Sequence, residues 1–516
     1  MQRNLLFWLR RGAGATTLSG FWIILATLLA AAPPPAAQAA VTARQATQQS
    51  AAPGATAMDA RLERAAGAID DGRFADALTL VDEAQAEAKL TAADADWASY
   101  LKARTLVGLG RGEEAEAMVR ERHRSNPNGY TWASLVSILT TRGQYDKAAS
   151  AILDLEEESL IYVNRLRPSV IENIVAALDG EGAKLRDQLI IRLVEGRYSG
   201  PTAQRVPDLL RLRYINLLLR QGRIEDAARQ TDALESPAIL SLLLADKSFE
   251  PMWEHPKLRA LLAPGALVAR VDRGVQARLE SQALTSSDWL DVMRALRAIG
   301  RSGEAVRLGL HALEQARSEK RPAGPALRLE IASAYAEMGK AWEARRAAHE
   351  LLREEVSAPV SLRIQIAAVL EVSGDDEGAL LLLGSVGEAS QSSSALRVAA
   401  CAAHDLGRRE KRDAALAALA SVVGAAPSDA LVAYVCVGEK DKAAEVLAGM
   451  FQRPELRAAA VLAAQLYADP LVPATDQSDM RYRMKALVAS AAVQDAIKPY
   501  ARTMALPFMM ANARGN

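Results

Sequence analysis

Aromatic residues are scarce in this sequence, at 5% of 516 residues, although hydrophobic residues make up 50% of it. The apolar content is therefore carried mostly by alanine, leucine and valine, and the aromatic and β-branched enrichment of a sheet protein is missing. Two cysteines are too few for a disulfide framework. Neither sign of charge dominates, because 62 Lys and Arg balance 62 Asp and Glu. A protein that binds nucleic acid through its overall field would be basic, so that class is disfavoured.

Motifs that carry catalysis or cofactor binding are also missing. The five histidines lack H-E-x-x-H spacing, and no Ser or Cys lies in a recognisable nucleophile elbow. The stretch GLGRG at 108–112 mimics a phosphate-binding loop, but Glu113 stands where the dinucleotide fingerprint needs glycine. His311 and His349 could come near each other on stacked second helices, but a solvated surface pair is the simpler interpretation. We therefore expect no metal, no cofactor and no enzyme activity.

The N-terminus has the pattern of an export signal. Arg3, Arg10 and Arg11 precede an apolar run at 18–32, and Ala37-Gln38-Ala39 follows it. This order predicts a signal peptide over 1–39, cleaved after Ala39, and a periplasmic or secreted protein. The alternative is an N-terminal membrane anchor, but the run spans only ~22 Å as a helix, short of a ~30 Å hydrocarbon core. After cleavage we expect no stable membrane insertion.

Residues 40–58 are small and polar and predict a flexible linker. The remaining length exceeds the roughly 250–300 residues at which a single core stops growing. Two domains or a repeat array are therefore expected.

A helix-hairpin pattern recurs through that length. In 130–153, apolar residues from Trp132 to Leu139 follow helical spacing, Gly143 stops the helix, and Ala148 and Ile152 begin a second stripe. At eight of the predicted turns a glycine is followed five residues later by alanine. These pairs are Gly72–Ala77, Gly110–Ala115, Gly143–Ala148, Gly222–Ala227, Gly300–Ala305, Gly339–Ala344, Gly374–Ala379 and Gly438–Ala443. Gly407 marks a weaker turn, with Arg412 where alanine is expected. With this turn included, neighbouring turns lie 31 to 39 residues apart within each run, which indicates a helical solenoid.

These units resemble the tetratricopeptide repeat (TPR) family. The match is fullest over 129–162, through Trp132, Leu139, Gly143 and Ala148, and it extends loosely over 59–460. The resemblance implies an all-α, right-handed α-solenoid of stacked helix hairpins. Pro- and aromatic-rich residues at 245–265 and a weaker echo at 468–477 interrupt the array.

We therefore predict two solenoid halves, with the alternative that the interruptions are unrelated connectors. The predicted parts are an N-terminal solenoid at 59–245, a connector at 246–265, a C-terminal solenoid at 266–467, a capping region at 468–500 and a tail at 501–516.

The two cysteines fall on predicted first helices of successive repeats. Cys401 lies six residues before Gly407, and Cys436 lies two residues before Gly438. These different heights argue against bonding distance. Buried thiols are the preferred interpretation, and a disulfide is the alternative.

The TPR resemblance implies that first helices line a concave groove that binds a protein or peptide. We expect a non-catalytic interaction scaffold of the cell envelope. The alternatives are an assembly factor for an envelope or exopolysaccharide-export machine and a helical carbohydrate-active enzyme. The candidate groove residues face away from the second helices: Trp97, Tyr100, Arg104, Tyr130, Asn216, Arg294 and Arg297. Leu212 departs from the cluster with which some relatives capture terminal carboxylates, so that mode is disfavoured.

Overall fold

The chain forms two compact units in the computed structural model, which divide between Gln230 and Thr231. The described residues are 57–70, 73–86, 90–155, 157–178, 180–200, 206–280, 284, 286–318, 324–354, 359–469 and 475–509. The predicted signal peptide at 1–39 lies outside them, as does the predicted linker up to residue 56. The predicted connector at 246–265 lies inside the second unit rather than between the two.

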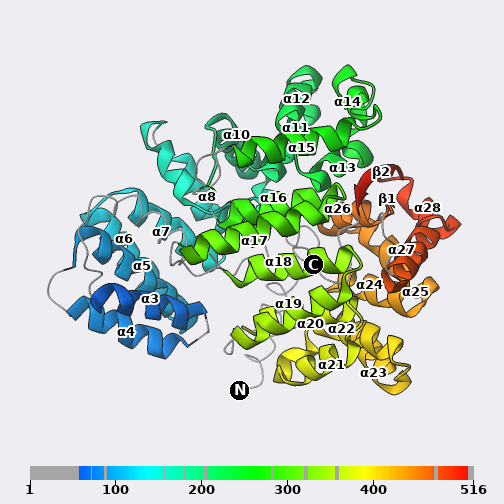
Figure 1. Cartoon of the computed structure of the whole chain (residues 1–516). Helices are drawn as coiled ribbons and strands as arrows, with labels where there is room; N and C mark the ends of the chain where they lie inside the picture. The colour runs from blue at the N-terminus through cyan, green and yellow to red at the C-terminus, as the bar shows by residue number, and fades with distance from the viewer. Residues whose placement is uncertain are drawn as a thin grey trace, which may run out of the picture. The chain divides into compact units, whose positions relative to one another are not determined.

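The N-terminal unit (57–230) is built of helices joined by short turns (Figure 1). Its elements are α3 (Ala57–Asp70), α4 (Phe74–Ala86), α5 (Ala92–Gly108), α6 (Gly112–Ser125), α7 (Gly129–Thr141), α8 (Tyr145–Leu153), η1 (Glu157–Arg165), α9 (Pro168–Ala177), η2 (Gly180–Gly182), α10 (Ala183–Glu195), α11 (Asp208–Arg220) and α12 (Ile224–Gln230). Over 163–207 the sequence keeps the repeat period but loses the repeat motif. The 3₁₀ segment η2 lies within this stretch, and η1 overlaps its start.

The C-terminal unit (231–509) begins with η3 (Thr231–Ala233), α13 (Pro237–Ala245), η4 (Lys247–Met252), α14 (Pro256–Leu261) and α15 (Ala266–Leu279). The hairpins that follow are α16 (Ser286–Ala298) with α17 (Ser302–Ser318), α18 (Pro325–Glu337) with α19 (Ala341–Glu354), α20 (Val360–Val372) with α21 (Asp376–Gly384), α22 (Ser393–Asp405) with α23 (Arg409–Val422), and α24 (Pro427–Val437) with α25 (Lys440–Gln452). A short 3₁₀ segment, η5 (Gly387–Gln391), precedes α22. The unit ends with α26 (Pro454–Ala463), β1 (Leu466–Ala468), α27 (Thr475–Val488), α28 (Ala491–Ile497) and β2 (Ala505–Met509).

The turn inside each hairpin is made by the predicted glycine. Gly143 has a φ of 71°, a left-handed conformation that costs glycine little. The next residue, Gln144, donates its backbone N–H to the carbonyl of Leu139 at 2.9 Å, which satisfies a carbonyl left over at the end of α7. The other predicted turn glycines among the described residues also have positive φ: Gly110, Gly222, Gly300, Gly339, Gly374, Gly407 and Gly438. The predicted hairpin turns are therefore confirmed for this part of the chain.

The alanine five residues after the glycine is buried where the two helices of a hairpin pair. Ala148 on α8 is fully buried. A larger side chain at this position would push α7 and α8 apart. The other predicted alanines are fully buried as well: Ala77, Ala115, Ala227, Ala305, Ala344, Ala379 and Ala443. Local turn chemistry and tight helix pairing together build one all-α hairpin repeat.

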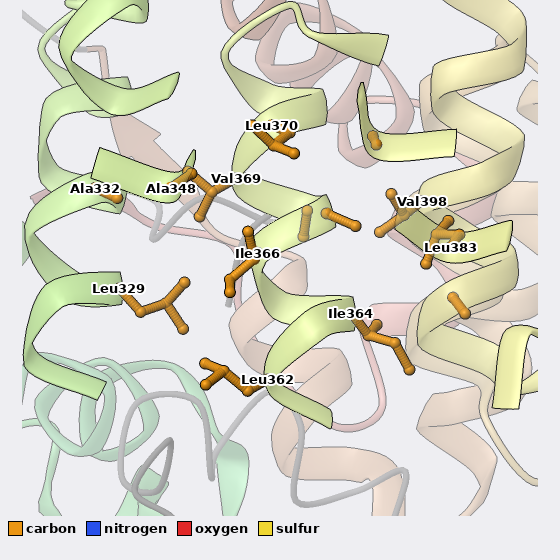
Figure 2. Close-up of a cluster of buried hydrophobic side chains, with 14 of the residues drawn as sticks. Leu329, Ala332, Ala348, Leu362, Ile364, Ile366, Val369, Leu370, Leu383 and Val398 are labelled. Carbon is orange, nitrogen blue, oxygen red and sulfur yellow. The ribbon is translucent and has the colours of Figure 1, made fainter. Parts of the chain in front are cut away.

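Stacked hairpins bury their apolar faces against one another. Figure 2 shows such a cluster around α20, whose Ile366 and Val369 are buried with Leu329 of α18 and Val398 of α22. First helices are therefore apolar on several sides, and α24 is buried at every residue from Pro427 to Cys436. Each hairpin depends on its neighbours for burial, as expected of a solenoid.

The two short strands lie close together although they are far apart in sequence. β1 and β2 pair in parallel, with Leu466 opposite Ala505. Among the described residues, no helix is both long and apolar enough to cross a membrane.

Candidate partner-binding surface

The first helices of successive hairpins form one continuous layer in each unit. In the N-terminal unit α3 contacts α5, and α5 contacts α7; in the C-terminal unit the contacts run from α16 through α18, α20 and α22 to α24. Along these two runs the second helices of neighbouring hairpins make far fewer contacts with one another, whereas farther along the N-terminal unit α8 and α10 do contact each other. Because the first helices approach each other more closely, the stack curves toward them. The side of that layer that faces away from the second helices is therefore the concave side of the stack. We call it the first-helix face.

Helix α5 presents three of the predicted site residues as a ladder. Trp97 and Tyr100 stack with ring centroids 5.6 Å apart, and the Arg104 guanidinium lies 5.9 Å from the centre of the Tyr100 ring. All three are half-buried, and Trp97 also packs against the core cluster of α3 and α4. Helical spacing of three and four residues explains why they meet. We call these three residues the α5 ladder.

Tyr130 lies at the start of α7 and is exposed at 41%. The Arg165 guanidinium covers one face of its ring at 3.9 Å from the centroid, a cation–π contact. The backbone N–H of Tyr130 donates to the Asn128 side chain at 2.8 Å, and that side chain caps α7. Tyr130 therefore has a fixed position at the start of α7.

Asp96 organises the loop before α7, a role that the sequence analysis missed. This carboxylate is buried on α5, beside Trp97, and it accepts hydrogen bonds from Arg122 at 2.7 Å and from Asn128 at 2.9 Å. Asn128 in turn caps the helix that carries Tyr130. The sequence did carry a signal of this role, because Asp96 stands between Ala95 and Trp97. A charged side chain that is buried among apolar residues needs hydrogen-bonding partners.

Arg294 and Arg297 do not face a partner, which corrects the sequence-based expectation. Both are buried on α16 and form ion pairs with Glu330 and Glu337 of α18. Arg297 donates from Nε and Nη2 to Glu337 at 2.9 and 2.7 Å. The adjacent first helices of the solenoid pack so tightly that these side chains are enclosed between them.

The charges in this network balance and hold each other ionised. Burial alone would lower the pKa of Arg297, but the carboxylates of Glu330 and Glu337 raise it far above its usual range. Burial likewise favours neutral Glu330, yet Arg297 and Arg294 lower the pKa of that carboxyl. The network links two hairpins and has a structural role.

Asn216 is half-buried on α11, and the structure does not bring it together with the α5 ladder. Leu212, one turn earlier, is buried. His311 and His349 have separate partners. His311 makes an edge contact with Trp289 at 6.1 Å between ring centres, and Nε2 of His349 lies 3.0 Å from Asp375.

In the C-terminal unit the end of the chain covers part of the first-helix face. Residues 475–509, here called the return segment, place α27 against α24 and β2 against α15 and α16. The Arg483 guanidinium donates to the carbonyl of Cys436 on α24. The Met509 side chain lies beside Gly300, where it would contact an added Cβ atom.

The return segment also joins the two interruptions of the repeat array. Arg502 donates its backbone N–H to Ala245 and its Nε to the carbonyl of Leu244, both in α13. Its guanidinium lies 3.8 Å from the centre of the Trp253 ring, and Asp246 forms a β-bridge with Ala501. In Figure 1 the red end of the chain accordingly returns beside α13 and α26. The return segment therefore packs against the connector at 246–265.

Two groups of potential metal ligands occur among the described residues, and both include Glu371 of α20. One group adds Cys401 and Cys436, and the other adds Asp376 and Asp405; within each group the ligand atoms lie within 4.8 Å of one another. Sequence spacing gave no sign of either group, because the residues come from separate helices.

Comparison with known proteins adds little to this picture. No family model matches the chain, and no curated protein matches it. Similar solved structures include the APC/C hetero-tetramer Cut9–Hcn1, at 11% identity and a TM-score of 0.27, with 86% of this chain and 96% of that chain covered. Another is the pentatricopeptide repeat protein PPR10 from maize, at 12% identity and a TM-score of 0.29, with 79% and 60% covered. At these values we draw neither a function nor a partner from them.

The hairpins themselves define the class of protein. Repeated turns with left-handed glycines, fully buried alanines at the helix pairing and a continuous layer of first helices make this chain an all-α, TPR-like helical-repeat solenoid.

Proposed function

We propose that the chain is a non-catalytic interaction scaffold of the cell envelope that binds a protein or peptide on the first-helix face of its N-terminal unit. The single observation that supports this location is the α5 ladder. Stacked aromatic rings next to an arginine are the side-chain types that dominate binding hot spots. Tyr130, which begins the next first helix and is held in place through Asn128, is a further contact point.

The C-terminal unit is a weaker candidate for the same role. Its first helix α24 is buried along most of its length, and α27 and β2 already cover elements of its inner layer. A partner would have to displace the return segment, including the contacts of Arg502 with α13 and Trp253.

The overall charge of the chain supports a protein partner over a nucleic acid. The formal net charge is zero, so no basic field would attract a phosphate backbone. An assembly factor for an envelope or exopolysaccharide-export machine would use the same surface and differ only in its partner. The helical carbohydrate-active enzyme has weaker support: the carboxylates of Glu371, Asp376 and Asp405 lie close together, but Glu371 and Asp376 are buried.

Binding at the α5 ladder can be tested with matched variants. Proteins that co-purify with the full chain are identified by mass spectrometry, and their Kd is then measured with purified components. Tyr100→Ala and Arg104→Ala should each weaken binding by at least ~1 kcal/mol, or about fivefold in Kd. Tyr100→Phe keeps the stacked ring and should bind nearly as well as the native chain.

The control is Glu121→Ala on the second helix α6, where an exposed pair with Arg124 contributes little. Helix content and melting temperature must match in all variants. If the Tyr100→Ala/Arg104→Ala double variant binds its partner as tightly as the Glu121→Ala control does, the proposed surface is wrong.

The envelope location has a separate test, because it depends on residues 1–39 alone. N-terminal sequencing of the mature protein should begin at Ala40. Recovery of the chain only in membranes, beginning at Met1, would support the anchor instead.

A further inference from the structure

The two cysteines meet in the interior of the C-terminal unit. Cys401 lies on α22 and Cys436 on α24, which are first helices in direct contact. Their sulfur atoms lie within 4.8 Å of each other, and both side chains are at most 1% exposed. This corrects the expectation that different heights keep them apart. Distance from the turn glycine gives equal height only if neighbouring helices are in register, and α22 and α24 are not.

The surroundings allow the close approach that a disulfide needs. Its Cα atoms must lie about 4.4–6.8 Å apart, nearer than the ~8–10 Å that separates most packed helix axes. Small residues flank both cysteines and are fully buried: Ala400, Ala402 and Ala403 on α22, and Ala430 and Ala433 on α24. These alanines let the two backbones approach each other without steric conflict.

We propose that Cys401 and Cys436 form a disulfide that links the first helices of two successive repeats. The structure holds the pair as two buried thiols whose sulfur atoms lie within 4.8 Å of each other. A bond between the sulfur atoms therefore requires only a small movement of the two side chains.

A disulfide also suits the local charge better than two free thiolates. Glu371 brings a carboxylate oxygen within 4.8 Å of both sulfurs. Two thiolates would add two buried negative charges beside this carboxyl group, which is costly. A disulfide is neutral and adds no charge beside Glu371.

The reaction needs a disulfide-bearing oxidant, for which glutathione disulfide is the probe. One cysteine thiolate attacks the oxidant and releases one glutathione thiolate, and the second cysteine then attacks the mixed disulfide and releases the other. Overall, two protein thiols are oxidised, one glutathione disulfide is reduced to two glutathione thiols, and the protons pass to the released thiolates. Because both sulfurs are buried, the bond must form before α22 and α24 pack, and reductants cannot easily reach it afterwards.

The bond would reinforce the place where the return segment docks. The carbonyl of Cys436 accepts a hydrogen bond from Arg483 of α27. Linking α24 to α22 therefore fixes the surface that receives α27. The bond also closes the stretch that contains α23, which restricts the unfolded chain.

Maleimide labelling tests the proposal on the full chain. The protein is refolded in a glutathione redox buffer and unfolded in guanidinium with N-ethylmaleimide, with or without prior reduction, and its intact mass is measured. The expected result is no label without reductant and two labels with it, because the chain has two cysteines. Two labels without reductant would overturn the disulfide. If one zinc ion per chain accompanies them, the Glu371–Cys401–Cys436 group is a metal site instead.

Serine variants provide the controls. Cys401→Ser and Cys436→Ser should each take up one label with or without reductant, and a dimer mass in either would reveal an intermolecular bond. Refolding under reducing conditions should lower the melting temperature of the native chain and leave that of the double serine variant unchanged. An equal decrease in both proteins would show that the bond does not stabilise the fold, which would overturn its proposed role.

Discussion

Glu172 is a buried carboxyl group whose titration should make the stability of the N-terminal unit depend on pH. It lies on α9, on the same buried side of the helix as Ile171 and Ile174. Burial raises the pKa of Glu172 to about 7, and the positive charge of Arg213 opposes this increase. Tyr198 is buried nearby, and its hydroxyl donates to the carbonyl of Leu166 at 2.8 Å. Burial raises the pKa of Tyr198, and the charge of Glu172 raises it further.

The direction of the effect follows from the proton balance. Below pH 4.5 the carboxyl is protonated in both the folded and the unfolded state, so it costs nothing. Between pH 4.5 and about 7 the unfolded chain releases the proton and the folded chain keeps it, so stability falls as the pH rises. Above pH 7 the loss levels off at about 3 kcal/mol, since each pKa unit corresponds to ~1.36 kcal/mol.

Replacing Glu172 by glutamine removes the buried charge and nearly preserves the shape. Glu172→Gln should match the native chain near pH 4.5 and exceed its stability by up to about 3 kcal/mol at pH 8. Urea unfolding is followed by circular dichroism at pH 5, 6, 7 and 8. Hydrogen exchange then assigns the change to residues 57–230.

The exposed Glu113 provides the control, because Glu113→Gln should follow the native pH dependence. All other titrating groups are common to the three proteins, so only the difference between curves matters. If Glu172→Gln loses stability between pH 5 and 8 as steeply as the native chain does, the reasoning is refuted.

Two further predictions concern packing. Ala148→Leu should destabilise the N-terminal unit by roughly 1–3 kcal/mol through overpacking at a fully buried helix contact. Hydrogen exchange that loosens equally around Ala443 would contradict a solenoid in which repeats couple mainly to neighbours. Arg297→Met should cost about 3–5 kcal/mol in urea unfolding, because it leaves the Glu330 and Glu337 carboxylates without their main partner. Adding Glu337→Gln to that variant should recover part of the loss, and a double variant less stable than the single one would contradict the charge argument.

The repeat itself was determined by the sequence. The turn at Gly143 depends on a conformation that glycine adopts easily, and the contact at Ala148 depends on a side chain small enough for two helices to meet. Both requirements are local, and both recur at a fixed spacing. They could therefore be recognised without knowing what packs around each hairpin. The α5 ladder was also readable, because Trp97, Tyr100 and Arg104 stand at helical spacing on one element.

Only the tertiary structure decided which side chains face one another across the repeats. Arg297 has the same spacing as a groove residue, yet α18 supplies Glu337 forty positions later and encloses it. Cys401 and Cys436 meet because α22 and α24 are offset along their axes, and Arg502 reaches Leu244 across 258 positions of the chain. Such pairings leave no period in the sequence, because they depend on the tilt and offset of whole helices. The unit boundary between Gln230 and Thr231 has the same origin, since it reflects where contacts are dense rather than where prolines gather.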